Sequence, residues 1–369
     1  MRVAIYAVLL ALVTGAVMAS ELRREPVYAF DGYAYAVRAQ LDAGIPYDRA
    51  MARARAVYAG KPAMQRPGLR HWLTAPQPKW WTLFQVRVLY PWLASLLWHR
   101  YDIESLFLVS ALMYVVATLL TYGYLLALVR PEAAAGIAAA VAALSPMRAF
   151  GRSDLTDMTA YAALVAALWA MTVFAKRSGK RAFALAACAS TALTLARPLA
   201  YVLICAAAPL LFSRRRARGI ALVALGIVLA AATAVALALV HAEDPFPARY
   251  LHLVAATSRT AATWFLDQPL SIVALIALIV RRGSPQAAIA LGAWLSILPT
   301  ILLDPFPSDV TRVVALPSLV PIACGTAYAL AMISRACRAT SEERSYAHPD
   351  RNTPPRGAHR ASRIRTSAS

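Results

Sequence analysis

Residues 219–241 read GIALVALGIVLAAATAVALALVH, an apolar stretch that contains no Asp, Glu, Lys or Arg. A helix needs about 20 apolar residues to cross the hydrocarbon core of a bilayer. The basic segment Arg214–Arg218 stands directly before this stretch. An uncharged run of this length, with basic residues at its edge, predicts a transmembrane helix.

The composition of the whole chain agrees with a membrane protein. Hydrophobic residues make up 60% of the 369 residues, mean hydropathy is +0.55, and only 15% are charged. Soluble domains contain about 25% charged residues. We therefore expect an all-α, polytopic bundle of about ten spans. Besides 219–241, the spans are expected near 3–19, 104–129, 131–147, 157–175, 182–196, 199–212, 264–280, 286–303 and 313–333. The first of these is favoured as an uncleaved anchor, although Val17-Met18-Ala19 also resembles the cleavage site of a signal peptide.

The basic loops predict the orientation of this bundle. Arg197-Pro198 divides one long apolar run whose two ends carry the basic clusters 176–181 and 214–218. Both ends must lie on one side, so the run is expected to form a hairpin with Arg197 at the outer turn. With ten spans, the short basic loops all fall on the side that the positive-inside rule assigns to the cytoplasm. The C-terminus is predicted to be cytoplasmic.

The net charge of +20 raises the question of a nucleic-acid partner. The positive charge lies in short clusters between apolar runs and in residues 339–369, and no nucleic-acid recognition module accompanies it. This distribution predicts contact with membrane lipid and no nucleic acid. Residues 1–338 are expected to form one membrane domain, and 339–369 a disordered basic tail on the cytoplasmic side.

Residues 20–103 form a long first loop on the outer side. Asp31 and Asp48 stand where they could cap two short helices, at 32–43 and 49–59. Residues 86–98 are apolar and aromatic but too short to span, so we expect a helix lying at the membrane interface.

Polar clusters at the outer ends of spans are candidates for chemistry, because polar groups there are costly. The first holds Asp31, Tyr33 and Tyr35. Its carboxylate could act as a general base, hold a divalent cation, or simply cap a helix. The second holds Arg87 and Tyr90. Its guanidinium could grip a phosphate or anchor the interfacial helix.

Two more clusters precede later spans. In the third, which also holds Arg152, Asp154 and Asp157 are three residues apart, so helical spacing would place both on one face at a helix N-terminus. One Asp would suffice as a cap, and the second favours a functional role. The fourth holds Asp309 and Arg312, which could bind a phosphate or form an ordinary ion pair.

Arg197 stands apart because apolar residues surround it. Its side chain either reaches the outer interface or points into a polar cavity. The sequence contains no Walker A motif, no His-Glu-x-x-His motif and no nucleophile elbow, which argues against the corresponding enzyme classes.

The order of these clusters resembles that in GT-C-type glycosyltransferases, and in particular in the bacterial members that use polyprenyl-phosphate donors. The resemblance lies in an acid soon after the first span, interfacial helices, and a later loop of the form Pro-x-x-x-x-Gly-Arg-x-x-x-Thr-Asp at 146–157. It implies hexosyl or pentosyl transfer to an acceptor outside the inner (plasma) membrane. The catalytic acids would be Asp31 and then Asp157 or Asp154, and the phosphate-binding residues Arg87, Arg197 and Arg312.

The resemblance also bears on a metal cofactor and on competing functions. Relatives often carry paired acids that would hold Mg²⁺ or Mn²⁺, whereas the matching position here has one acid, Asp31, followed by Gly32. One alternative is a transporter or flippase of a lipid-linked or anionic substrate, which predicts charges deep within spans. The other is a non-catalytic scaffold, which predicts that the acids lie far apart.

Overall fold

The computed structural model describes residues 1–65, 82–144, 146–240, 250–266, 269–303 and 310–347. Within these ranges the chain is almost entirely helical, and the β-structure is one isolated bridge between Val27 and Ser153. The predicted all-α class is therefore confirmed.

Six helical stretches are long and apolar enough to cross a membrane. They are α1 (Arg2–Leu22), α6 (Glu104–Leu126), α8 (Asp157–Lys176), α11 (Arg216–Leu239), Pro285–Leu302 within α14 (Pro285–Leu295) and α15 (Ile297–Leu303), and Ser318–Thr340 within α16 (Val310–Ala347). The shorter apolar helices are α7 (Glu132–Leu144), α10 (Ala200–Ala207) with η5 (Ala208–Phe212), and α13 (Pro269–Val280). The remaining long elements are α9 (Lys180–Ala196) and α12 (Tyr250–Leu266).

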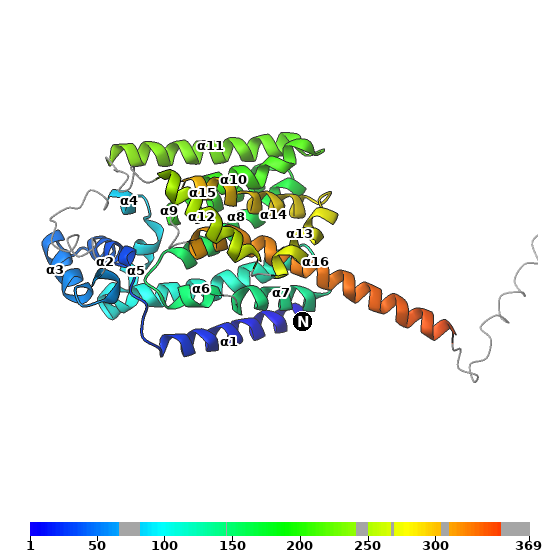
Figure 1. Cartoon of the computed structure of the whole chain (residues 1–369), viewed down its shortest axis with the longest axis horizontal. Coiled ribbons are helices and arrows are strands. Elements are labelled where there is room, and N and C mark those ends of the chain that lie inside the picture. The colour runs from blue at the N-terminus through cyan, green and yellow to red at the C-terminus, as the bar shows by residue number, and fades with distance from the viewer. Residues whose placement is uncertain (66–81, 145, 241–249, 267–268, 304–309, 348–369) are drawn as a thin grey trace, which may run out of the picture.

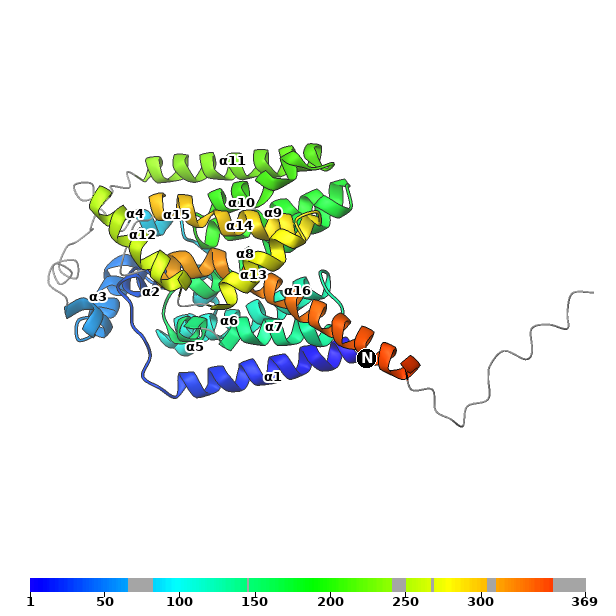
Figure 2. The same ribbon diagram turned by 45° about the vertical axis from the view of Figure 1, so that its right-hand side comes forward.

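The long helices run side by side, with α1 and α11 at opposite edges in both views (Figures 1 and 2). Only 17% of the apolar window of α1 and 11% of that of α11 is buried, against 78% for α8. Apolar helices exposed to this extent would be unstable in water, but they match a hydrocarbon environment. The outer helices therefore present a lipid-facing surface around a core centred on α8.

Small residues bring neighbouring helices close together. A Cβ on Gly292 of α14 would collide with the backbone of Cys205 and Ala206 in α10. A Cβ on Gly325 of α16 would collide with Ala274 of α13 in the same way. Close backbone approach of this kind is how membrane helices gain van der Waals contact, since lipid offers no hydrophobic drive for packing.

The first loop folds into a compact helical layer at one end of the bundle (Figure 1). Its elements are α2 (Phe30–Asp42), α3 (Tyr47–Tyr58), η1 (Pro62–Gln65), α4 (Thr82–Gln85) and α5 (Leu89–Tyr101). They share a separate core with buried tyrosines at positions 33, 35, 58 and 90. The predicted interfacial helix is present as α5, displaced by three residues toward the C-terminus.

Several local predictions are wrong. Asp31 and Asp48 lie inside the first turns of α2 and α3, whose N-caps are Ala29 and Pro46, and neither N-cap residue makes a side-chain capping hydrogen bond. Helix α16 continues to Ala347, so residues 339–347 of the predicted disordered tail are helical. The rest of that tail lies outside the described residues.

Candidate functional site

Two segments that are far apart in the sequence meet at the end of the bundle covered by α2–α5. The N–H of Val27 donates to the carbonyl oxygen of Arg152 at 3.2 Å, and the N–H of Asp154 donates to the carbonyl oxygen of Val27 at 3.4 Å. This short parallel bridge joins the chain before α2 to the loop between η4 (Pro146–Arg152) and α8. It brings the first and third polar clusters into one site.

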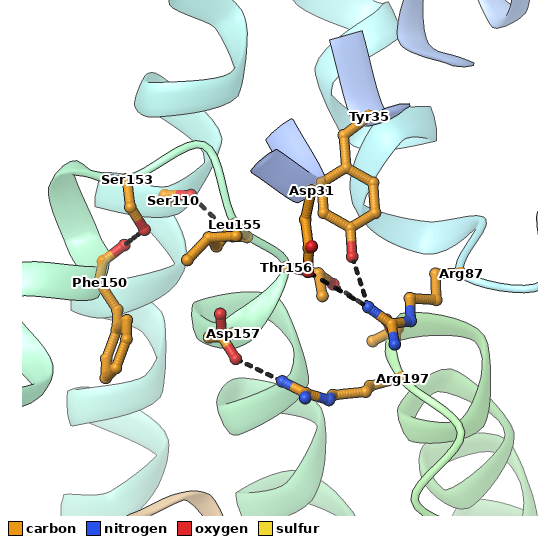
Figure 3. Close-up of polar contacts among 11 residues, drawn as sticks. Asp31, Tyr35, Arg87, Ser110, Phe150, Ser153, Leu155, Thr156, Asp157 and Arg197 are labelled. Carbon is orange, nitrogen blue, oxygen red and sulfur yellow. Dashed lines mark hydrogen bonds and ion pairs between the residues drawn. The ribbon is translucent and has the colours of Figure 1, made fainter. Parts of the chain in front are cut away.

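Asp31 faces Arg87 within this site. The Nη1 atom of Arg87 lies 3.6 Å from Asp31 Oδ2 and donates to the hydroxyl of Tyr35 at 3.0 Å (Figure 3). The guanidinium also stacks over the ring of Phe84, 5.0 Å from its centroid. The side chains of Asp31 and Arg87 are 20% and 16% exposed. A carboxylate and a cation are thus held together with partial access to solvent.

Asp157 and Arg197 form a second ion pair, which is deeply buried. Arg197 Nη1 lies 2.5 Å from Asp157 Oδ1, and the side chains are 6% and 0% exposed (Figure 3). Arg197 has extended backbone where α9 ends and α10 has not begun, and this break directs its side chain to the start of α8. The alternative that Arg197 reaches the outer interface is therefore wrong, and the side chain points into a polar interior.

Asp154 is enclosed by protein donors. Its Oδ1 accepts from the N–H of Ala29 at 2.8 Å, and its Oδ2 accepts from the hydroxyl of Tyr58 at 2.5 Å. Burial raises the pKa of Asp154 to about 7, although both hydrogen bonds oppose that rise. Helix α8 begins only at Asp157, so the prediction that Asp154 and Asp157 share one helical face is wrong.

The close contact of Gly32 with Asp154 places the acids together. A Cβ on Gly32 would overlap the Asp154 carboxylate, so only glycine fits beside it. The negative charge of Asp31 contributes to the raised pKa of Asp154. The pKa of Tyr90 is raised first by its burial, and also by the charges of both Asp154 and Asp157. The three predicted acids therefore converge on one end of the bundle.

Among the other predicted site residues, Tyr33 and Tyr90 have contacts within the protein. The hydroxyl of Tyr33 points to Met51 Sδ at 3.8 Å, and that of Tyr90 donates to the carbonyl oxygen of Leu106 at 3.0 Å. Asp309 lies outside the described residues, and Arg312 is described only as part of the backbone of α16. A role of these residues toward a substrate stays a prediction.

Glu21, in the last turn of α1, is a polar centre that the sequence reasoning missed. Its carboxylate lies 3.4 Å from Arg24, 4.0 Å from Arg148 and 3.3 Å from Arg152, and its side chain is buried. An acid at the end of an apolar run was the available signal. This cluster holds Arg152, a member of the third predicted polar cluster, against α1.

Tyr58 was also missed, and no local signal could have found it. Tyr58 and Asp154 are 96 residues apart in the sequence. Burial raises the pKa of the Tyr58 hydroxyl well above its ordinary value, and the negative charge of the neighbouring Asp154 raises it further. Its phenol therefore stays protonated and donates to Asp154. Helix α3 is anchored to the site through this contact.

The described residues do not fit a divalent cation. No three His, Cys, Asp or Glu side chains gather within the described ranges in a way that could hold a metal. Asp31 and Asp157 each face a guanidinium, and Asp154 is surrounded by hydrogen-bond donors.

We compared the chain with protein-family models and with curated proteins. No family model matches this chain. No curated protein gives a significant match to it. We therefore infer the function of this protein from the geometry of its site.

Proposed function

We propose that this protein is an integral membrane glycosyltransferase of the GT-C type, which moves a sugar from a polyprenyl-phosphate donor to an acceptor. The observation that supports this proposal is the convergence of two acid–arginine pairs, Asp31–Arg87 and Asp157–Arg197, where the first-loop helices meet the bundle (Figure 3). The lipid tail of the donor would stay in the bilayer beside the exposed apolar helices. Its phosphate would reach the polar end.

In the proposed reaction, the acceptor hydroxyl oxygen forms a bond to the anomeric carbon of the donor sugar. The bond between that carbon and the phosphate oxygen breaks, and polyprenyl phosphate leaves with the electron pair. Asp31 takes the hydroxyl proton, since its carboxylate is partly exposed and is oriented by Arg87. Arg87 stabilises the charge that develops on the leaving phosphate.

The buried pair has a supporting role in this scheme. Asp157 is fully enclosed, so it holds Arg197 at the inner wall of the site. Arg197 would add positive charge beneath the phosphate, in a region where water does not screen it. The enclosed Asp154 would position Asp31 through Gly32.

The proposal includes the finer topology. Ten spans in the inner (plasma) membrane, with the C-terminus in the cytoplasm, would place residues 20–103 and the site on the outer face. The six long apolar helices and the shorter ones support a multi-pass arrangement. The basic loops Arg130, Arg214–Arg218 and Arg281-Arg282 support the orientation.

The transporter alternative receives less support. It predicts charged residues in the middle of spans, where a substrate would cross. In the six candidate spans, every Asp, Glu, Lys and Arg lies within the first or last two turns, such as Glu21, Asp157 and Arg335. The polar chemistry of these spans is thus at the membrane surfaces.

The decisive experiment measures sugar transfer in membranes that contain the full chain, using a panel of radiolabelled polyprenyl-phosphate sugars. Asp31→Asn should lower the rate at least about 100-fold, because it removes a general base. Asp42→Asn is the matched control, since it removes an acid at the other end of the same helix, and it should retain the rate. Transfer that is unchanged in Asp31→Asn would remove Asp31 from catalysis. No chain-dependent transfer from any donor would refute the proposed function.

A further inference from the structure

The start of α1 and the later part of α16 lie at the end of the bundle opposite to the first-loop helices (Figure 1). A cavity of about 530 Å³ opens there between the start of α1, the connection from α6 to α7, and the later part of α16. Cavities of this size are typical of ligand sites. Its charged lining residues are Arg2, Arg130, Glu132, Arg335 and Arg338.

The charge of this lining favours an anion. Four arginines and one glutamate give the lining of this cavity a net charge of +3. Arg335 and Arg338 are three residues apart on α16, so they project from the same face of that helix. Both α1 and α16 pack against α7, so the arginines come from three segments held in a defined arrangement. Like charges held together repel each other, and a bound anion would relieve that repulsion.

The position of the four arginines relative to the bilayer identifies the source of that anion. Arg2 begins α1, Arg130 lies between α6 and α7, and Arg335 and Arg338 lie in the last two turns of the span Ser318–Thr340. All four therefore lie where spans end, at the level of the lipid headgroups. Phospholipid phosphates are concentrated at that level, and the planar fork of arginine matches phosphate oxygens.

We infer that this cavity binds the headgroup of a multiply charged anionic phospholipid through its four arginines. A headgroup with two phosphates would match the surplus of positive charge. Basic pockets between membrane helices are suited to such headgroups. This binding site is separate from the proposed sugar-transfer site and does not depend on it, because the two lie at opposite ends of the bundle.

The test uses the full-length protein in phosphatidylcholine nanodiscs with increasing fractions of cardiolipin, and native mass spectrometry to count bound cardiolipin. Removing each arginine should weaken binding about fivefold, so Arg335→Gln/Arg338→Gln should weaken it about 25-fold. Arg214→Gln/Arg216→Gln removes the same charge from exposed positions at the start of α11, outside the cavity, and should leave binding unchanged. Glu132→Gln, which removes the single acid of the lining, should strengthen binding about fivefold.

The outcomes separate the sources of the anion. Equal weakening by the two double variants would mean general surface attraction and would overturn the proposal. A wild-type protein that binds pyrophosphate at the cavity but shows no preference for cardiolipin would assign the site to a soluble phosphate and overturn the lipid assignment. If the α16 double variant does not fold, the increase expected for Glu132→Gln still tests the proposal, and no increase would refute it.

Discussion

Replacing Asp157 by Asn should destabilise the protein strongly, because the charge of Arg197 would stay buried without its carboxylate. The two side chains are 0% and 6% exposed, and the ion-pair distance is 2.5 Å, so solvent and salt screen the pair little. Removing one partner of a buried ion pair costs about 3–5 kcal/mol. We expect a loss of that size in the free energy of unfolding for Asp157→Asn.

A double-mutant cycle isolates the interaction. Asp157→Asn/Arg197→Gln replaces both charges by amides that can still hydrogen-bond, so it should recover much of the loss. The coupling energy should be about 2–3 kcal/mol. The assay is unfolding of the purified chain by SDS titration in mixed micelles, followed by circular dichroism.

The matched control is the exposed pair Arg38 and Asp42 on α2, which has a distance of 2.9 Å and side chains that are 33% and 18% exposed. Its coupling energy should be about 0.5 kcal/mol or less, because water screens it. A loss of less than about 1 kcal/mol for Asp157→Asn would refute the claim that Asp157 compensates a buried charge on Arg197. A coupling energy no larger than that of the control pair would refute it as well.

Two further predictions concern the packing around Asp154. Gly32→Ala should destabilise the fold by about 1–3 kcal/mol, because the added methyl group would overlap the Asp154 carboxylate. In the same assay, Gly60→Ala should change stability by less than about 0.5 kcal/mol, because a Cβ at that position contacts no other atom. Equal effects of the two variants would contradict the contact between Gly32 and Asp154. Because the pKa of Asp154 rises from 3.8 to about 7 on folding, the folded state holds a proton that the unfolded chain releases. The free energy of unfolding should therefore fall as pH rises from about 4 to about 7, by up to about 4 kcal/mol, and level off above that. Asp154→Asn should remove this slope in a pH series, and a slope that persists in the variant would assign it to another group.

The sequence was sufficient for the membrane character and for most element positions. A long uncharged run such as 219–241 must form a helix in a bilayer, because each of its backbone N–H and C=O groups needs a hydrogen bond within the segment. That constraint acts locally, so α6, α8, α11 and α14 lie close to the predicted spans. The same reasoning also located the first-loop helices and the acids at the ends of spans.

Only the tertiary structure decided what each polar side chain does. Asp31 and Asp154 both had plausible local roles as caps, yet Asp31 faces Arg87 and Asp154 accepts from Tyr58. Local rules could not distinguish these outcomes, because the partners come from segments that are distant in sequence. Arg197 turned inward for the same reason: the carboxylate that compensates its charge, Asp157, lies on another helix. Sequence periodicity thus determined which helices form, and packing between them determined which charges meet.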